Sequence, residues 1–113
     1  MRIATLLSYA GGFKQAVAEV QELEKAGLDV VWVPEAYSFD APSAMGYLAA
    51  QTERVTIASG ILPIYTRTPS LLAMTAAGVD YLSAGRTMVG LGASGPQGIE
   101  GFHGGPYAAP GAR

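Results

Sequence analysis

Short apolar segments rich in β-branched residues alternate along the chain with longer segments in which apolar residues recur every three or four positions. The first pattern is typical of buried strands and the second of amphipathic helices. The predicted strands lie at residues 3–8, 30–33, 55–62 and 87–91. Helices are predicted between them, from Gly11-Gly12 to Gly27, from about Pro42 to Gln51 and from Pro69 to Gly85.

Capping residues mark the ends of these helices. Gly27 follows the first helix in the C′ position, where a left-handed conformation ends many helices. Asp40 is predicted to be the N-cap of the second helix, with Pro42 in its first turn. Thr68 and Pro69 predict the same arrangement for the third helix.

Strands that are apolar on both faces and are joined by helices predict a parallel sheet covered by helices, built through right-handed crossovers. An eightfold β/α barrel uses about 31 residues per unit, which is close to the spacing of the predicted strands. The 113 residues correspond to about 3.6 such units. The expected fold class is therefore α/β of the (β/α)8 TIM-barrel type, limited to about four units. A flavodoxin-like open sheet is the alternative, although that fold usually has five strands.

The last part of the chain has a different composition. Residues 90–113 contain eight of the 15 glycines and three prolines. We therefore expect residues 1–92 to form a half barrel of four strands and three helices, and residues 93–113 to be a loop or a truncated tail. A half barrel would expose an unpaired apolar edge on its first and fourth strands. The expected partner is either a second copy, giving a homodimer, or the remainder of a longer chain.

Composition and charge exclude several classes of function. A net charge of −2 and scattered Lys and Arg residues argue against a nucleic-acid partner. The lack of cysteine excludes a disulfide framework and Cys-ligated zinc, and with a single His no metal site is expected. The apolar run before Gly11-Gly12 is too short to span a membrane and lacks a fitting signal-peptide cleavage site. A cytoplasmic protein without a membrane partner is expected.

Candidate chemistry lies at the strand ends, because ligands of β/α barrels bind at the carboxyl-terminal face. Glu35 follows the second strand and could act as a general base, but a cap or an ion pair with Arg67 is the favoured interpretation. Core packing is favoured over ligand stacking for Trp32. His103 could donate to a ligand or act as an acid, although a loop role is favoured. Gly90 and its neighbouring glycines would let backbone amides approach a bound group closely.

Five blocks of sequence together carry a resemblance to a known family. They are residues 31–37 (VWVPEAY), 49–55 (AAQTERV), 59–62 (SGIL), 66–74 (TRTPSLLAM) and 90–97 (GLGASGPQ) with 100–104 (EGFHG). In this order they resemble the N-terminal part of the luciferase-like monooxygenase family, and most of all its branch that depends on the deazaflavin coenzyme F420. The resemblance covers nearly the whole chain but only the first half of the family's length.

The resemblance implies a β/α barrel that binds coenzyme F420, or FMN as the alternative, at its carboxyl-terminal face. A hydride would pass between the ring and a small organic substrate. In such proteins the third strand ends in a bulge, often with a non-proline cis peptide, and Gly60-Ile61 is the matching step. The implied catalytic residues are Glu35 and His103. The implied cofactor-binding residues are Ser8, Tyr9, Ala36, Gly60, Ile61, Ser94, Gly95 and Gln97.

Two features depart from the family pattern. Pro63 stands where a polar residue is common, and the second half, which usually supplies contacts to the cofactor phosphate, is not present. Three classes of function therefore stay open: an oxidoreductase, a cofactor-binding module without turnover, and a half barrel that only self-associates. Cofactor binding separates the first two classes from the third, and turnover separates the first from the second.

Overall fold

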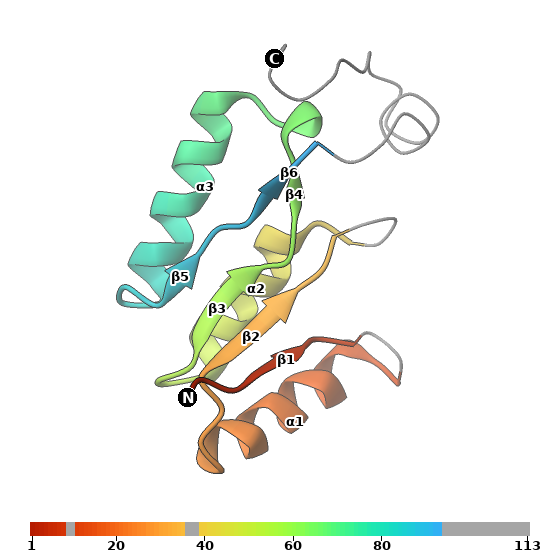
Figure 1. Cartoon of the computed structure of the whole chain (residues 1–113), viewed down its shortest axis with the longest axis vertical. Helices are drawn as coiled ribbons and strands as arrows, with labels where there is room; N and C mark the ends of the chain where they lie inside the picture. The colour runs from red at the N-terminus through yellow and green to blue at the C-terminus, as the bar shows by residue number, and fades with distance from the viewer. Residues whose placement is uncertain (9–10, 36–38, 94–113) are drawn as a thin grey trace.

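The computed structural model describes residues 1–8, 11–35 and 39–93 (Figure 1). The sheet runs through the molecule, with α1 beside β1, α3 beside β5 and α2 behind β2 and β3. The helices are α1 (Phe13–Lys25), α2 (Ala41–Gln51) and α3 (Pro69–Leu82), with a 3-10 turn at Ile64–Thr66. The strands are β1 (Ala4–Leu6), β2 (Val30–Val33), β3 (Thr56–Ser59), β4 (Leu62–Pro63), β5 (Thr87–Met88) and β6 (Leu91–Gly92).

The main sheet has the strand order β1-β2-β3-β5, and each pair of neighbours is parallel. Each strand therefore lies beside the next one along the chain, separated from it by a helix on the covered face. A flavodoxin-like sheet changes direction in its strand order, whereas the units of a β/α barrel follow one another in sequence. The observed order is that of consecutive barrel units.

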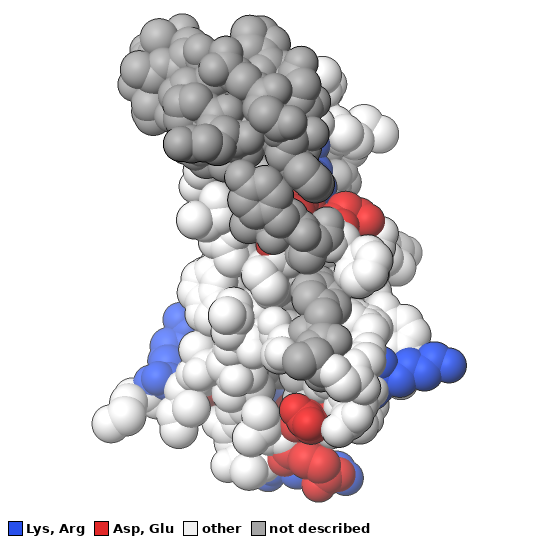
Figure 2. Space-filling model, turned by 90° about the vertical axis from the view of Figure 1, so that its right-hand side faces the viewer, with Lys and Arg blue, Asp and Glu red and all other residues white. Residues whose placement is uncertain are grey.

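The charged side chains do not gather into one surface on the side of the molecule seen in Figure 2. They lie mainly at its lower end and along its margins, with one acidic spot higher up, and the rest of the visible surface of the described residues is uncharged. An exposed ion pair joins Lys25 and Glu22, one turn apart on α1, at 3.3 Å. Such exposed pairs contribute little to stability.

The hydrophobic core lies between the sheet and the helices. Val31, Val33 and Ile57 are fully buried there, against Met45 and side chains from all three helices. Successive residues of a strand point to opposite faces of a sheet. The residues that alternate with these therefore lie on the other face of the sheet, which no described helix covers; it is called the uncovered face below.

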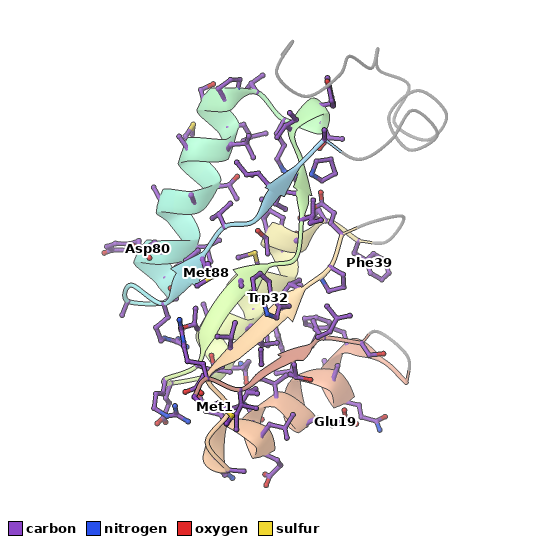
Figure 3. All side chains as sticks on the ribbon, in the orientation of Figure 1. Met1, Glu19, Trp32, Phe39, Asp80 and Met88 are labelled. Carbon is purple, nitrogen blue, oxygen red and sulfur yellow. The ribbon has the colours of Figure 1, made fainter. Side chains whose placement is uncertain are left out.

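The uncovered face of the sheet carries one row of apolar residues. The strand register aligns Leu6 with Trp32, Trp32 with Ala58, and Ala58 with Met88. Leu6 is 64% exposed, and Trp32 and Met88 lie on the side of the sheet away from α2 (Figure 3). Trp32 is only partly buried and lies outside the core cluster of the described residues. The prediction that it packs in the core is wrong, because its position along β2 alternates with the two core valines.

The helix boundaries agree with the capping predictions. The Asp40 carboxylate accepts a hydrogen bond from the Ser43 N–H at 3.0 Å, and the Thr68 hydroxyl accepts one from the Leu71 N–H at 3.1 Å. Gly27 has φ +108°, a value that an L side chain rarely adopts, directly after the end of α1. Among the described helices, none is both long and apolar enough to cross a membrane.

The predicted third and fourth strands are each divided in two. The third breaks at Gly60-Ile61 into β3 and β4, and the fourth breaks at residues 89–90 into β5 and β6. The short strands β4 and β6 pair with each other in a second, parallel sheet. The prediction of continuous strands is wrong here, because both breaks lie inside apolar runs and hydropathy alone carries no signal for them.

Candidate functional site

The candidate site lies where the parallel strands of the main sheet end. The described part of the chain places Ser8 after β1, Glu35 after β2, and Gly60 and Ile61 after β3, all at the carboxyl end of the sheet. Ser8 and Ile61 are exposed there. The remaining predicted site residues lie outside the described residues: Tyr9, Ala36, Ser94, Gly95, Gln97 and His103.

Glu35 forms a two-pronged ion pair with Arg67. The two guanidinium nitrogens of Arg67 donate to the two carboxylate oxygens, each at 2.7 Å. The Glu35 side chain is 8% exposed and that of Arg67 is 11% exposed. The N–H of Ala41, the first residue of α2, also donates to Glu35 at 2.6 Å. The ion pair and the cap that the sequence favoured are thus both confirmed.

This ion pair connects three segments of the strand-end face. Glu35 follows β2 and holds the first turn of α2, while Arg67 lies between the 3-10 turn and Thr68, the N-cap of α3. The hydrogen bond to Glu35 raises the pKa of Arg67; desolvation opposes that shift, and the charges of Glu35 and Asp40 add to it. Three N–H donors occupy the Glu35 carboxylate, so the described geometry suits positioning. Its catalytic role stays a prediction.

Asp40 lies next to this pair and stays anionic. The hydrogen bond from the Ser43 hydroxyl lowers the pKa of Asp40; desolvation opposes this, and the Ser43 N–H and the charge of Arg67 lower the pKa further. The negative charge is favourable at this position, because the N-terminus of a helix carries a partial positive charge.

The Gly60-Ile61 step packs against the end of β2. The Gly60 N–H donates to the Val33 carbonyl at 2.8 Å, and a Cβ on Gly60 would lie 3.6 Å from the Pro34 Cα. The side chain of Ile61 is 56% exposed. No cis peptide bond occurs in the described residues, so the expected cis bond at this step is wrong for this structure. The trans form is the lower-energy one for a non-proline peptide.

Ser59 is a residue of this region that the sequence interpretation did not assign to the site, and it contacts Gly90, which was noted there only as a place where a backbone amide could approach a ligand. Ser59 is fully buried, and its hydroxyl accepts from the Gly90 N–H at 2.7 Å and donates to the Gly90 carbonyl at 3.0 Å. A serine followed by glycine inside an apolar run was the available signal. Its partner, 31 residues away, could not be identified from the pattern.

The opposite end of the sheet holds a separate polar cluster with a structural role. The Glu24 carboxylate accepts from the backbone N–H groups of residues 53–55. Burial raises the pKa of Glu24, but these hydrogen bonds and the charge of Arg86 lower it more, so the net shift is downward. The Arg86 guanidinium donates to the carbonyls of Ala49 and Thr52 at the end of α2. A cation is favourable at the C-terminus of a helix.

The charges of the strand-end surface are therefore held in hydrogen bonds and an ion pair beside an exposed apolar side chain. The Glu35 carboxylate is paired with a guanidinium, the neighbouring Asp40 carboxylate caps α2, and Ile61 presents an aliphatic side chain. In the described ranges, no group of three or more His, Asp or Glu residues could hold a metal ion. Such a surface can offer a flat ring an apolar contact at Ile61.

Comparison with known proteins agrees with this description. The family model for luciferase-like monooxygenases matches residues 1–113. The chain belongs to the luciferase-like monooxygenase family. The resemblance inferred from the five sequence blocks is thereby confirmed.

Two relatives show which luciferase-like proteins the chain is similar to. A protein of Mycobacterium tuberculosis that bears the name coenzyme F420-dependent oxidoreductase Rv3520c is 38% identical over 115 residues, covering 100% of this chain and 33% of that protein. A 5,10-methylenetetrahydromethanopterin reductase of Methanolobus tindarius is 31% identical over 70 residues, covering 61% of this chain and 22% of that protein. The chain thus spans a third or less of the length of these luciferase-like relatives.

Solved structures of similar proteins confirm the fold class. An F420-dependent secondary alcohol dehydrogenase, solved with an F420-acetone adduct, superposes with a TM-score of 0.83 at 25% identity over 96% of this chain and 36% of that one. The oxygenating constituent of 3,6-diketocamphane monooxygenase from Pseudomonas putida, solved with FMN, gives a TM-score of 0.78 at 18% identity, covering 92% of this chain and 32% of that one. The luciferase-like chain has the α/β fold of a partial TIM barrel.

Proposed function

We propose that this chain is the amino-terminal, ring-binding part of a coenzyme F420-dependent oxidoreductase that acts on a small organic substrate. The observation that carries the proposal is the break at Gly60-Ile61. It presents an exposed apolar side chain at the carboxyl end of the sheet, beside a neutralised carboxylate. The similarity of the whole chain to a relative named for F420 supports the same cofactor.

The described residues fit a deazaflavin or flavin ring. At position 92 an added Cβ would lie 2.5 Å from the Ile61 side chain, so only a glycine leaves room for Ile61 in its present position. A bound deazaflavin supplies the hydride-transfer chemistry. The chain's own part is to bind: Ile61 contacts the ring, Gly60 lets the chain pass close to Pro34, and the Glu35–Arg67 pair holds the segment after β2.

FMN is the alternative cofactor, and a specific observation supports it. The solved monooxygenase that superposes on 92% of this chain contains FMN. Its 18% identity is well below the 38% identity to the relative named for F420, so F420 is the first choice. Both rings are flat tricycles that would use the same strand-end surface. The two cofactors are therefore tested in parallel.

The remaining predicted site residues keep their proposed roles. Ser8, Tyr9, Ala36, Ser94, Gly95 and Gln97 would line the ring or its tail, and Glu35 and His103 would lie towards the substrate.

A partner is also proposed. In the described residues the outer edges of β1 and β5 have no strand beside them, so a second copy or the rest of a longer barrel would cover them.

The test is a fluorescence titration of the 113-residue chain with coenzyme F420 and, separately, with FMN. Saturable binding of F420 is expected, and Gly60→Val should weaken it by about tenfold, because a Cβ there is already in contact with the Val33 carbonyl oxygen at 3.4 Å and the two valine methyl groups would crowd the Gly60-Ile61 step. Gly78→Val is the matched control, since a Cβ at that exposed position of α3 meets nothing within 4 Å. Binding of neither cofactor, or equal binding by both variants, would refute the proposal.

Turnover separates an enzyme from a module that only binds. With a reduced cofactor bound, an oxidoreductase oxidises it in the presence of a carbonyl substrate, and the absorbance of the oxidised ring reports the reaction. If the cofactor binds but no member of a panel of small ketones and aldehydes oxidises it, the binding-module alternative is the better description.

A further inference from the structure

Ser59 is a polar residue at the end of an apolar strand, and its hydroxyl is committed to a single distant residue. The side chain is fully buried. Its oxygen accepts from the Gly90 N–H at 2.7 Å and donates to the Gly90 carbonyl at 3.0 Å. Both strands break at this contact, since β3 ends at Ser59 and β6 begins just after Gly90.

The Gly90 carbonyl also binds the residue on the other side of the break in the third strand. The Gly90 oxygen also accepts from the Leu62 N–H at 2.8 Å. Ser59 and Leu62 flank the Gly60-Ile61 step, so both ends of this step are attached to one acceptor. The Gly60-Ile61 step is thereby a short loop whose two ends are both hydrogen-bonded to Gly90, between β5 and β6.

Gly90 allows this arrangement because there is no room for a side chain. A Cβ at position 90 would lie 2.7 Å from the Ser59 carbonyl oxygen and 2.8 Å from that of Gly60. These are backbone atoms, which cannot move aside as a flexible side chain can. The backbones of the two breaks are therefore in direct contact, and the Ser59 hydroxyl links them.

We propose that Ser59 is a positioning residue: its hydroxyl determines where Ile61 lies on the strand-end surface and so shapes the face offered to the cofactor ring. Ser59 itself is too deeply buried to touch a ligand. It acts through the Gly60-Ile61 step, whose isoleucine is 56% exposed. The link to the cofactor rests on the proposed function, whereas the effect on Ile61 does not.

The experiment compares Ser59→Ala, which removes the hydroxyl, with Ser59→Cys, which replaces it with a somewhat larger thiol that hydrogen-bonds only weakly. Ser83→Ala is the matched control. Ser83 is also buried, at 1% exposure, and accepts from the Arg86 N–H before β5, at the opposite end of the sheet. The measurements are amide hydrogen exchange of Gly90, the methyl resonances of Ile61, the free energy of unfolding, and F420 affinity.

In Ser59→Ala the Gly90 N–H loses its partner, and its exchange should become about tenfold faster. The Ile61 methyl resonances should shift, and the affinity for F420 should fall by about tenfold, because a displaced contact costs binding. For Ser59→Cys, the Gly90 exchange rate, the Ile61 resonances and the F420 affinity should lie between those of Ser59→Ala and those of the natural chain. Ser83→Ala should lower the free energy of unfolding but leave the Ile61 resonances and the F420 affinity unchanged. If Ser59 only stabilised the fold, the two variants would have the same effect on Ile61 and on affinity.

Unchanged Ile61 resonances and unchanged Gly90 exchange in folded Ser59→Ala would overturn the proposal. So would equal losses of affinity in Ser59→Ala and Ser83→Ala. If Ser59→Ala does not fold, the same comparison is made with Ser59→Cys, whose Ile61 resonances then decide. If the natural chain binds no F420, the proposed function fails on that result, and the exchange and resonance data still decide for or against Ser59.

Discussion

At the scale of single residues, the strand-end face depends on how one carboxylate is neutralised. Glu35 and Arg67 are both nearly buried and joined by two hydrogen bonds of 2.7 Å. Removing a charge from water is costly, and a partner with good geometry compensates for that cost. Removing one member of the pair should therefore lower the free energy of unfolding more than replacing both members.

Arg67→Met should lower the free energy of unfolding by about 3 kcal/mol, because it leaves the Glu35 carboxylate buried without its cation. The double variant Arg67→Met/Glu35→Leu should regain most of that loss. Lys25→Met removes a partner from a pair whose side chains are about three-quarters exposed, and should cost less than about 0.5 kcal/mol. Urea unfolding measures all three, and equal effects of Arg67→Met and Lys25→Met would contradict the argument.

Glu24 makes stability depend on pH at the other end of the sheet. Its folded-state pKa lies below the ordinary value of 4.5, so the stability it adds is fully present above that value. This contribution is lost as the pH falls through the lower, folded-state pKa. Three backbone N–H groups depend on the carboxylate, so protonation weakens all three hydrogen bonds.

Glu24→Gln should lower the free energy of unfolding by about 1 kcal/mol at neutral pH, and should make little difference in strong acid, where the natural side chain is also neutral. Urea unfolding across the acidic range checks this. Glu22→Gln, which alters an exposed carboxylate on the same helix, should keep the pH dependence of the natural chain. A Glu24→Gln variant with an unaltered pH profile would rule the mechanism out.

At the scale of elements, the breaks in the third and fourth strands form one paired feature. β4 and β6 pair with each other because β3 and β5 both end at the contact between Ser59 and Gly90. The helices, in contrast, begin and end at local capping residues. A substitution at a strand break should therefore act on both strands, and one on an exposed helix face should act locally.

Gly90→Ala and Gly78→Ala should change stability in opposite directions. At position 90 the new Cβ meets two carbonyl oxygens within 2.8 Å, and a loss of at least about 2 kcal/mol is expected. In α3 the new Cβ of Gly78→Ala meets no atom within 4 Å, and the better helix former should add up to about 1 kcal/mol. Thermal unfolding of both variants tests this, and a Gly90→Ala variant as stable as the natural chain would show that the breaks are not in tight contact.

At the scale of the whole molecule, one face of the sheet lacks a cover in the described residues. Leu6, Trp32 and Met88 line it, and the strand order leaves β1 and β5 at the edges. Eight parallel strands close a barrel of this type. A rotation by half a turn about an axis along the strands keeps their direction, so two copies could join β5 of one to β1 of the other.

The 113-residue chain should therefore sediment at twice its mass of 11.7 kDa. Leu6→Lys, which places a charge on the uncovered face, should shift the equilibrium to the monomer. Leu71→Lys, at an exposed position of α3, should not. Sedimentation equilibrium at several concentrations distinguishes these cases. A natural chain that stays monomeric at every concentration would exclude self-association and leave the remainder of a longer barrel as the cover.

The sequence by itself determined the order of strands and helices, the helix caps at Asp40 and Thr68, and the family. These features depend on contacts between residues three or four positions apart, or on the spacing of apolar residues, so they can be predicted from short stretches of chain. The Glu35–Arg67 pair could also be predicted, since opposite charges followed neighbouring strands. The face of the sheet on which Trp32 lies and the divided strands were decided only in the tertiary structure. Their cause lies in contacts such as that of Ser59 with Gly90, 31 residues apart, which form only when the strands pack side by side.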